Sequence, residues 1–233
     1  MLKFPDALVR AIVIKRYKRF FVDAALDDGT IVTAHCPNTG SMKSCFSAGD
    51  SIWLSPSNSP TRKLKWTWEL VETTGGYIGV NTARPNLICE DAIKAAKIPE
   101  LLHYTEFSRE VKYGKNSRID LLLSSPNKAA CYVEVKNTTL LKDNKVMFPD
   151  SVSERGQKHL LELIDVVKGG KRGVILFLIN RPEGDFFCPA DDIDPKYGSI
   201  FRSALLQGVE ALAYRSVHSL EGTSIGEKVN IVT

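Results

Sequence analysis

Residues 118–136 read RIDLLLSSPNKAACYVEVK and form two apolar, strand-like runs that each carry one acid. Asp120 lies in the first run, and Glu134 lies in the second, two residues before Lys136. Because side chains alternate across a strand, Glu134 and Lys136 share one face. The turn signal at residues 124–127 predicts that the two strands fold back and pair, which brings two carboxylates and one ammonium group together.

These three charged groups have two interpretations. On exposed strands they would form a solvated ion pair of little energetic value. The apolar neighbours instead indicate strands buried on both faces, where a charge needs a partner or a metal ion. Mg²⁺ and Mn²⁺ are held by one or two carboxylates with waters and phosphate oxygens, and a nearby lysine can orient an attacking water. The segment therefore favours metal-assisted phosphodiester hydrolysis.

The composition predicts a cytoplasmic protein of one large or two small domains. The chain has 233 residues, of which 43% are hydrophobic, and no apolar run reaches the ~18 residues of a membrane span. The first residues contain no apolar block followed by a small-residue cleavage site. The five cysteines are an odd number without a CxxC pair, which argues against a disulfide framework and a thiolate zinc site.

Positive charge is concentrated in the N-terminal third. Residues 1–66 carry ten Lys and Arg against five Asp and Glu, whereas residues 67–233 carry 21 against 22. Such an asymmetry is typical of a protein that binds a polyanion, most simply nucleic acid.

The N-terminal part is predicted to be a small β-barrel. Its short strand-like runs are residues 11–15, 19–26, 30–35, 51–54, 64–72 and 77–80, with a hairpin turn at 27–29. This spacing favours an OB-like barrel. Residues 15–20 interleave cations with aromatics, a pattern that suits phosphates and stacked bases, or else an edge strand protected by charge. Trp66 and Trp68 are expected to pack in the core.

The C-terminal part is predicted to be an α/β domain that begins at residue 83. A helix is expected at 87–96, and a capping box formed by Ser151 and Glu154 opens a second helix through Val167. Asp194 is expected to cap a third helix that reaches Gln207. The predicted strands are 108–113, 119–123, 131–135, 173–179 and, as the last element, 209–215. The order αβββαβαβ defines the fold class.

With its acids on the second and third strands after a helix, this part resembles the PD-(D/E)XK nuclease superfamily. Asp120 matches the first acid of that superfamily, Glu134 the second acid, and Lys136 the lysine. The whole chain resembles the sugar fermentation stimulation protein A family through RYKRF, HCPNTGSM, TRKLKWTWELVE, SRIDLLL, CYVEVKNTT, FPDSVSERGQKHLLEL and DIDPKYG. The resemblance implies an OB-like domain (1–82), a nuclease-like domain (83–233) and DNA binding. Cleavage does not follow from the fold alone, because members can lose activity and keep the fold.

Further site residues are expected, one from the resemblance and the others from the residues themselves. Such nucleases often take an extra acid from the first helix, where Glu90 is the match, and Glu110 on the first strand is the alternative. His159 is expected to be packed or solvent-facing. The loop around Gly40 either offers N–H groups to a phosphate or forms a structural turn. The residues expected to contact DNA are Lys15, Arg16, Lys18, Arg19, Asn38, Ser41, Arg62, Lys63, Arg155, Gln157 and Lys158.

These observations favour a DNA-binding protein with little sequence preference and an Mg²⁺ or Mn²⁺ site. The expected metal ligands are Asp120, Glu134 and the Val135 carbonyl, with Lys136 orienting the nucleophile. The alternative is a non-catalytic DNA-binding regulator of sugar metabolism in which the three charged residues persist as a buried network. A third interpretation, binding of a sugar or sugar phosphate, is suggested only by the family's name.

Overall fold

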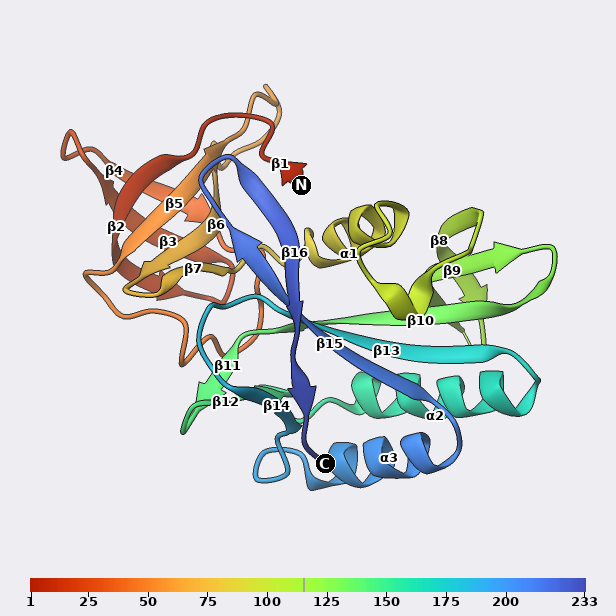
Figure 1. Ribbon diagram of the computed structural model, residues 1–233. Coiled ribbons are helices and arrows are strands. Elements are labelled where there is room, and N and C mark those ends of the chain that lie inside the picture. Colours follow the sequence, from red (N-terminus) through yellow and green to blue (C-terminus); the bar gives the residue numbers. More distant parts are fainter. Residues whose placement is uncertain (115) are drawn as a thin grey trace.

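The computed structural model describes residues 1–114 and 116–233 and consists of a β-barrel packed beside one end of an α/β domain (Figure 1). The barrel closes through five strands, because β4 pairs in parallel with β6 while the other neighbours pair antiparallel. Its strands are β2 (Val9–Tyr17), β3 (Phe21–Leu26), β4 (Ile31–His35), β5 (Ser51–Pro56) and β6 (Trp66–Thr73), with β7 (Gly76–Gly79) paired to β6. This arrangement confirms the predicted OB-like barrel.

Aliphatic and aromatic side chains of the barrel strands fill its interior. Trp68 is fully buried, packs edge-on against Phe46 with ring centroids 5.0 Å apart, and donates its indole N–H to the Leu70 carbonyl at 3.0 Å. The indole hydrogen bond lets a large polar-tipped ring be buried at little cost. The core position expected for Trp68 is therefore confirmed, and Trp66 packs against the same cluster.

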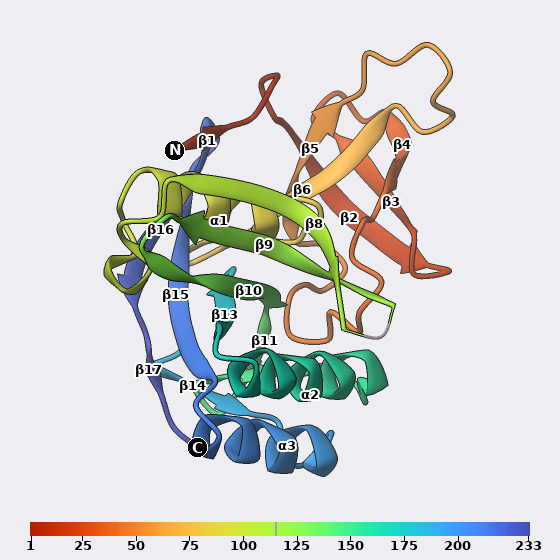
Figure 2. The same ribbon diagram turned by 90° about the vertical axis from the view of Figure 1, so that its right-hand side faces the viewer.

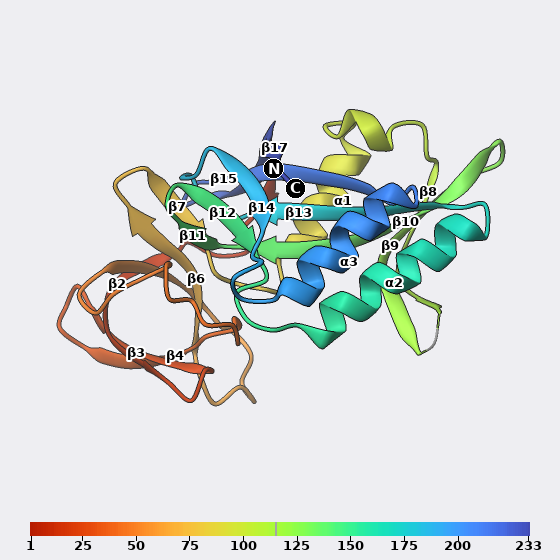
Figure 3. The same cartoon turned by 90° about the horizontal axis from the view of Figure 1, so that it is seen from below.

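A seven-stranded mixed sheet, in the order β1-β16-β15-β13-β10-β9-β8, organises the second domain. Helix α1 (Pro85–Lys94) covers one face of the sheet, and α2 (Glu154–Lys168) and α3 (Pro195–Leu206) cover the other (Figure 2). The two latter helices run side by side (Figure 3). The strands are β1 (Leu2–Lys3), β8 (Glu106–Tyr113), β9 (Ser117–Ser125), β10 (Lys128–Thr138), β13 (Arg172–Ile179), β15 (Glu210–His218) and β16 (Gly222–Lys228), with a 3-10 turn at Pro99–Leu101. The predicted α/β domain is thereby confirmed.

Helix α2 begins two residues later than a cap at Ser151 would place it. Ser153 is the N-cap, and its hydroxyl accepts the Gly156 N–H at 3.0 Å. The prediction that Ser151 caps this helix is therefore wrong. Asp194 caps α3 as expected, because its carboxylate accepts the Tyr197 N–H at 2.9 Å.

The sequence did not predict a second, four-stranded sheet in the order β11-β12-β14-β17. Its strands are β11 (Leu140–Lys142), β12 (Lys145–Phe148), β14 (Phe186–Pro189) and β17 (Asn230–Ile231). The prediction that residues 209–215 form the last element is also wrong, because β16 and β17 follow β15. Strands of two to four residues give too few alternations to be recognised, and β16 contains two glycines, which are poor strand formers.

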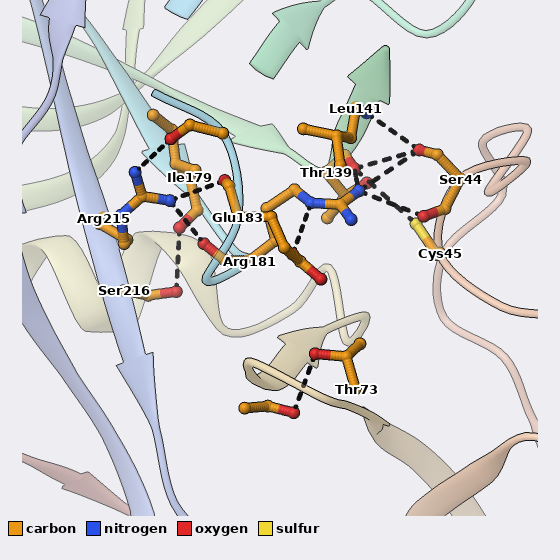
Figure 4. A network of polar contacts seen from close by, with 12 residues as sticks. Ser44, Cys45, Thr73, Thr139, Leu141, Ile179, Arg181, Glu183, Arg215 and Ser216 are labelled. Carbon is orange, nitrogen blue, oxygen red and sulfur yellow. Dashed lines mark hydrogen bonds and ion pairs between the residues drawn. The ribbon is translucent and has the colours of Figure 1, made fainter. Parts of the chain in front are cut away.

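Arg181 joins the two domains from a buried position, 3% exposed. Its guanidinium donates to the carbonyls of Ser44 at 3.2 Å and Thr139 at 2.7 Å, and its Nε pairs with Glu183 at 2.9 Å (Figure 4). The loop after β4 is thus fixed to the junction between β10 and β11. In the part of the chain that the structure describes, no helix has the length and apolar character needed to cross a membrane.

Candidate metal and nucleic-acid site

Strands β9 and β10 separate at the point where their acids lie. Their register runs to the pair Leu121 and Val133. Beyond this pair, the side chain of Asp120 replaces the backbone of β9 as the hydrogen-bond partner of β10, because its Oδ2 accepts the Val135 N–H at 2.8 Å. The other oxygen, Oδ1, accepts the amide of Asn86 from the first turn of α1 at 2.9 Å. Both carboxylate oxygens of Asp120 are therefore held in fixed directions.

Glu134 is 2% exposed and carries the second carboxylate. Its Oε1 accepts a hydrogen bond from Lys136 Nζ at 2.8 Å and contacts His159 Nδ1. Arg155 Nε donates to His159 Nε2 at 3.4 Å, so Nε2 is the acceptor and Nδ1 carries the proton that points at Glu134. Glu134 Oε2 is buried and has no hydrogen-bond partner among residues 1–114 and 116–233.

The electrostatics of the two acids differ. Burial and the charge on Glu134 raise the pKa of Asp120 to about 6. Burial also raises the pKa of Glu134, but the hydrogen bond from His159 and the charge and hydrogen bond of Lys136 outweigh burial and hold that pKa below its ordinary value. Glu134 is thus the ionised member of the pair, and Asp120 is the member that changes charge near neutral pH.

Two tyrosines with buried hydroxyl groups, Tyr113 and Tyr197, lie in the electrostatic field of Glu134. Burial, and then the charge on Glu134, raise the pKa values of both Tyr113 and Tyr197. In the described chain neither hydroxyl has a hydrogen-bond partner. A buried polar atom without a partner is destabilising unless a water or an ion satisfies it.

These donors fit a hard divalent cation. The buried Glu134 Oε2 without a partner, next to a second carboxylate of raised pKa, offers oxygen ligands and excess negative charge. The described residues contain no group of three or more His, Cys, Asp and Glu side chains suited to a metal. A pair of carboxylates is a ligand set with which proteins hold Mg²⁺ or Mn²⁺, because these ions keep several waters and substrate oxygens.

Glu90 is held by two ion pairs, and Glu110 is exposed to solvent. Glu90 pairs with Lys94 at 2.6 Å and Arg109 at 3.1 Å, and Asn86, one turn earlier on α1, makes the contact with Asp120. Glu110 is exposed on β8 at a positive φ of 53°. A catalytic role for Glu90 stays a prediction.

The three residues of helix α2 that were predicted to bind phosphate do not all face solvent. Gln157 is buried and donates to both oxygens of Asp194, at 3.0 and 3.1 Å, so it ties α2 to the start of α3. Arg155 is exposed beside His159, and Lys158 is exposed and lies 3.6 Å from Glu162. Arg155 and Lys158 are thus on the solvent side of the site.

The basic hairpin of the barrel has one clamped arginine and an exposed tip. Arg16 Nη2 donates to the carbonyls of Arg19 at 3.1 Å, Asn38 at 2.8 Å and Gly40 at 3.0 Å. Lys18 and Arg19 are exposed at positive φ values of 49° and 64°. Arg16 therefore shapes the loop, and its neighbours are the cations that face solvent.

Apart from Lys63, the other predicted DNA contacts of the barrel have partners within the protein. Asn38 Oδ1 accepts the Gly40 N–H at 2.8 Å, and Ser41 donates its N–H to Asp150 at 2.8 Å, so the loop is a structural turn between domains. The other three predicted contacts are Lys15, 3.7 Å from Asp23; Arg62, which donates to Thr67 at 2.7 Å; and Lys63, which is exposed.

Sequence reasoning missed two contacts of the acid pair, from His159 and Asn86. His159 is packed, as expected, but against Glu134 and Lys136. The available signal was its place on the inner face of α2, next to the buried Leu160. Asn86 lies in a turn before the apolar face of α1 begins, and no periodicity marks it.

The chain combines an OB barrel with an α/β domain that carries a pair of acids where two strands separate, and this combination defines a class of two-domain proteins. Comparison with known protein families identifies the family. Residues 14–80 match the SfsA N-terminal OB domain, and residues 83–222 match the Sugar fermentation stimulation protein RE domain. The chain therefore belongs to the sugar fermentation stimulation protein (SfsA) family.

Whole-length relatives support this assignment. The chain is 49% identical over 228 residues to a sugar fermentation stimulation protein homolog of Geobacter sulfurreducens, covering 98% of this chain and 97% of the relative. It is 50% identical over 230 residues to a homolog of Geotalea uraniireducens, covering 99% of each. Among solved structures, SfsA of Pyrococcus furiosus in complex with Ca²⁺ is similar, with a TM-score of 0.90, 27% identity, and coverage of 100% of this chain and 98% of that one.

Proposed function

We propose that the protein is a DNA-binding phosphodiesterase that depends on Mg²⁺ or Mn²⁺. The observation that carries the proposal is the buried Glu134 Oε2 without a hydrogen-bond partner in the described chain, beside Asp120. The Pyrococcus furiosus relative was solved with Ca²⁺, another cation that prefers oxygen ligands. That relative supports an oxygen-liganded cation in this chain as well.

The roles of the residues follow from their contacts. Asp120, Glu134 and the Val135 carbonyl would hold the cation, which supplies charge stabilisation at the phosphate and a more acidic bound water. His159 and Lys136 fix Glu134 Oε1, so that Oε2 keeps its direction. Lys136, whose side chain is 11% exposed, orients the attacking water and stabilises charge that develops at the phosphate.

The barrel supplies the electrostatic part of DNA binding. Its exposed cations Lys18 and Arg19 lie at the tip of a hairpin in the part of the chain with excess positive charge. Phosphate contacts of this kind bind strongly but carry no sequence information. We also place the protein in the cytoplasm, since four of its five free cysteines are buried and a reducing compartment keeps them as thiols.

A non-catalytic DNA-binding regulator is the second candidate. The observation in its favour is that the Lys136 ammonium group pairs with Glu134 and that His159 contacts the same oxygen, so the charge on Glu134 is compensated without a metal ion. Both candidates bind DNA, and only the first one cleaves it.

Cleavage assays separate the two candidates. Single-stranded, duplex, flapped and branched DNA would be incubated with Mg²⁺ or Mn²⁺ and with wild type, Asp120→Asn or Lys136→Met. Lys136→Met is expected to lower turnover by about 10²–10³-fold, the usual effect of removing one preorganised electrostatic group. Lys128→Met, an exposed substitution on the same strand, is the matched control and should retain full activity. Wild type that cleaves none of these substrates would favour the regulator.

A further inference from the structure

A cavity of about 340 Å³ lies between the barrel and the α/β domain. One wall is the loop after β4, a second is the end of β10 with the start of β11, and a third runs from β12 toward α2. Arg19, from the tip of the basic hairpin, and Thr39 also line it, and both are exposed at its rim. Elements from both domains are therefore needed to build this space.

The walls of the cavity are fixed by contacts that cross between elements. Ser41 donates its N–H and its hydroxyl to Asp150 Oδ2, at 2.8 and 3.2 Å. Arg16 holds the Gly40 carbonyl from one side, and Arg181 ties the same loop to Thr139 on the other side, as Figure 4 shows for Arg181. A cavity whose walls are held in this way binds a ligand with little loss of conformational entropy.

The lining has the chemistry of a nucleobase site. Its apolar part is Leu140, Met147 and Phe148, which suit the face of an aromatic ring. Its polar part includes Asn137 and Asp150. Asn137 Oδ1 accepts a hydrogen bond from Asn180, so its amide N–H remains as a donor. Asp150 Oδ1 has no hydrogen-bond partner among the described residues and remains as an acceptor. A base presents a flat apolar face together with donors and acceptors on one edge.

The cavity also lies close to the two acids. Asn137 directly follows Lys136 on β10, and it lies three residues beyond Glu134 along the strand, a spacing of about 10 Å at 3.3 Å per residue. Phe148 packs edge-on against Tyr197, at 5.3 Å between ring centroids, and Tyr197 lies in the field of Glu134. A strand whose phosphate reaches the acids therefore brings a neighbouring base to the cavity.

We propose that this cavity binds one unpaired base of the DNA strand that is cut at Asp120 and Glu134. The proposal rests on the proposed function and adds its substrate class, which is single-stranded or locally unpaired DNA. A base stacked in a duplex is not accessible to such a cavity and must leave the stack to enter it. Arg19 at the rim meets the phosphate next to the bound base.

The test is a scan of abasic positions along a single-stranded oligonucleotide, with binding measured in EDTA so that no cleavage occurs. Wild type is expected to show one position at which loss of the base weakens binding by about 5- to 150-fold, the range measured for one stacked base. Thr39→Trp places a large ring at the rim of the cavity and should abolish this sensitivity. Thr39→Ser keeps the space and should retain it. Lys18→Gln, in the same hairpin tip but outside the lining, should weaken intact and abasic oligonucleotides equally.

The outcomes distinguish this proposal from the proposed function. A flat scan in wild type, or equal sensitivity in wild type and Thr39→Trp, would overturn the base site and leave the nuclease intact. A sensitive position in wild type that Thr39→Trp removes, together with no cleavage in the Mg²⁺ and Mn²⁺ panel, would support the base site in a regulator. Absence of all DNA binding by wild type would overturn both proposals.

Discussion

Asp120 Oδ2 accepts the Val135 N–H at 2.8 Å, so a side chain takes the place of a strand where β9 and β10 separate. The contact satisfies a backbone donor that would otherwise lose its partner inside the sheet. It also fixes the carboxylate of Asp120 beside the strand that carries Glu134. The fold itself therefore holds Asp120 in a buried position, where the pKa of its carboxyl is raised to about 6.

Asp120→Asn is expected to stabilise the metal-free protein at neutral pH. Burial and the charge on Glu134 raise the pKa of Asp120 from 3.8 to about 6. The stability contributed by its protonated form is complete below pH 3.8 and is lost as the pH rises to about 6. Asparagine stays neutral, so the variant should gain about 1–3 kcal/mol over wild type at pH 7.5 and much less at pH 4.5.

Urea unfolding in EDTA at the two pH values measures this difference. Asp165→Asn, on the exposed face of α2, is the control and should leave stability nearly unchanged at both. A gain of the same size at pH 4.5 and pH 7.5 would contradict the assignment of a raised pKa to Asp120.

His159 is expected to set the metal affinity through Glu134. Its Nδ1–H points at Glu134 Oε1, and removal of such a supporting group usually weakens metal binding about 10–100-fold. His159→Ala should therefore bind Mn²⁺ about 10–100-fold more weakly by calorimetry, and Glu134→Gln and Asp120→Asn should each lose at least as much. His159→Asn keeps a donor near the position of Nδ1 and should retain most of the affinity. Equal losses in His159→Asn and His159→Ala would show that His159 acts through packing alone.

The sequence predicts those parts of the site that depend on local pattern. Alternation places Glu134 and Lys136 on one strand face, and the two contact each other at 2.8 Å. Contacts that depend on how α1 and α2 lie over the sheet carry no such local pattern. His159 and Asn86 belong to this group, because a helix position reveals only which face it is on, not which strand residue it meets.

The same limit applies to the fold. Most strands of the barrel and of the central sheet are five residues or longer, and either alternation or a continuous apolar run marks them in the sequence. The exceptions are β1 and β7, which are shorter, and β16, which contains two glycines. The sheet of β11, β12, β14 and β17 joins segments up to about 90 residues apart, and each of its strands is too short to show a period. Only the tertiary structure brings these segments together.

Arg181→Met is expected to destabilise the protein strongly. Arg181 is 3% exposed and donates to the carbonyls of Ser44 and Thr139, so its loss leaves buried acceptors and Glu183 without their partner. The expected loss is about 3–5 kcal/mol in urea unfolding, the range for removal of one member of a buried ion pair. Arg202→Met breaks an exposed pair with Asp191 and should lose less than about 1 kcal/mol. Similar losses in both variants would contradict the role of Arg181 as a buried polar link between the domains.

The exposed hairpin tip is expected to determine the salt dependence of DNA binding. Each phosphate contact to a single strand contributes about 0.7 to the slope of log affinity against log salt concentration. Lys18→Gln with Arg19→Gln should therefore reduce the slope by about 1.4, because both side chains are exposed. Arg16→Gln removes one positive charge, from a guanidinium that already donates to three carbonyls, and it should act mainly by loosening the loop at Asn38 and Gly40. Fluorescence anisotropy titrations between 50 and 300 mM salt would measure the slopes. A slope that stays unchanged in the double variant would place the DNA-binding surface away from this hairpin.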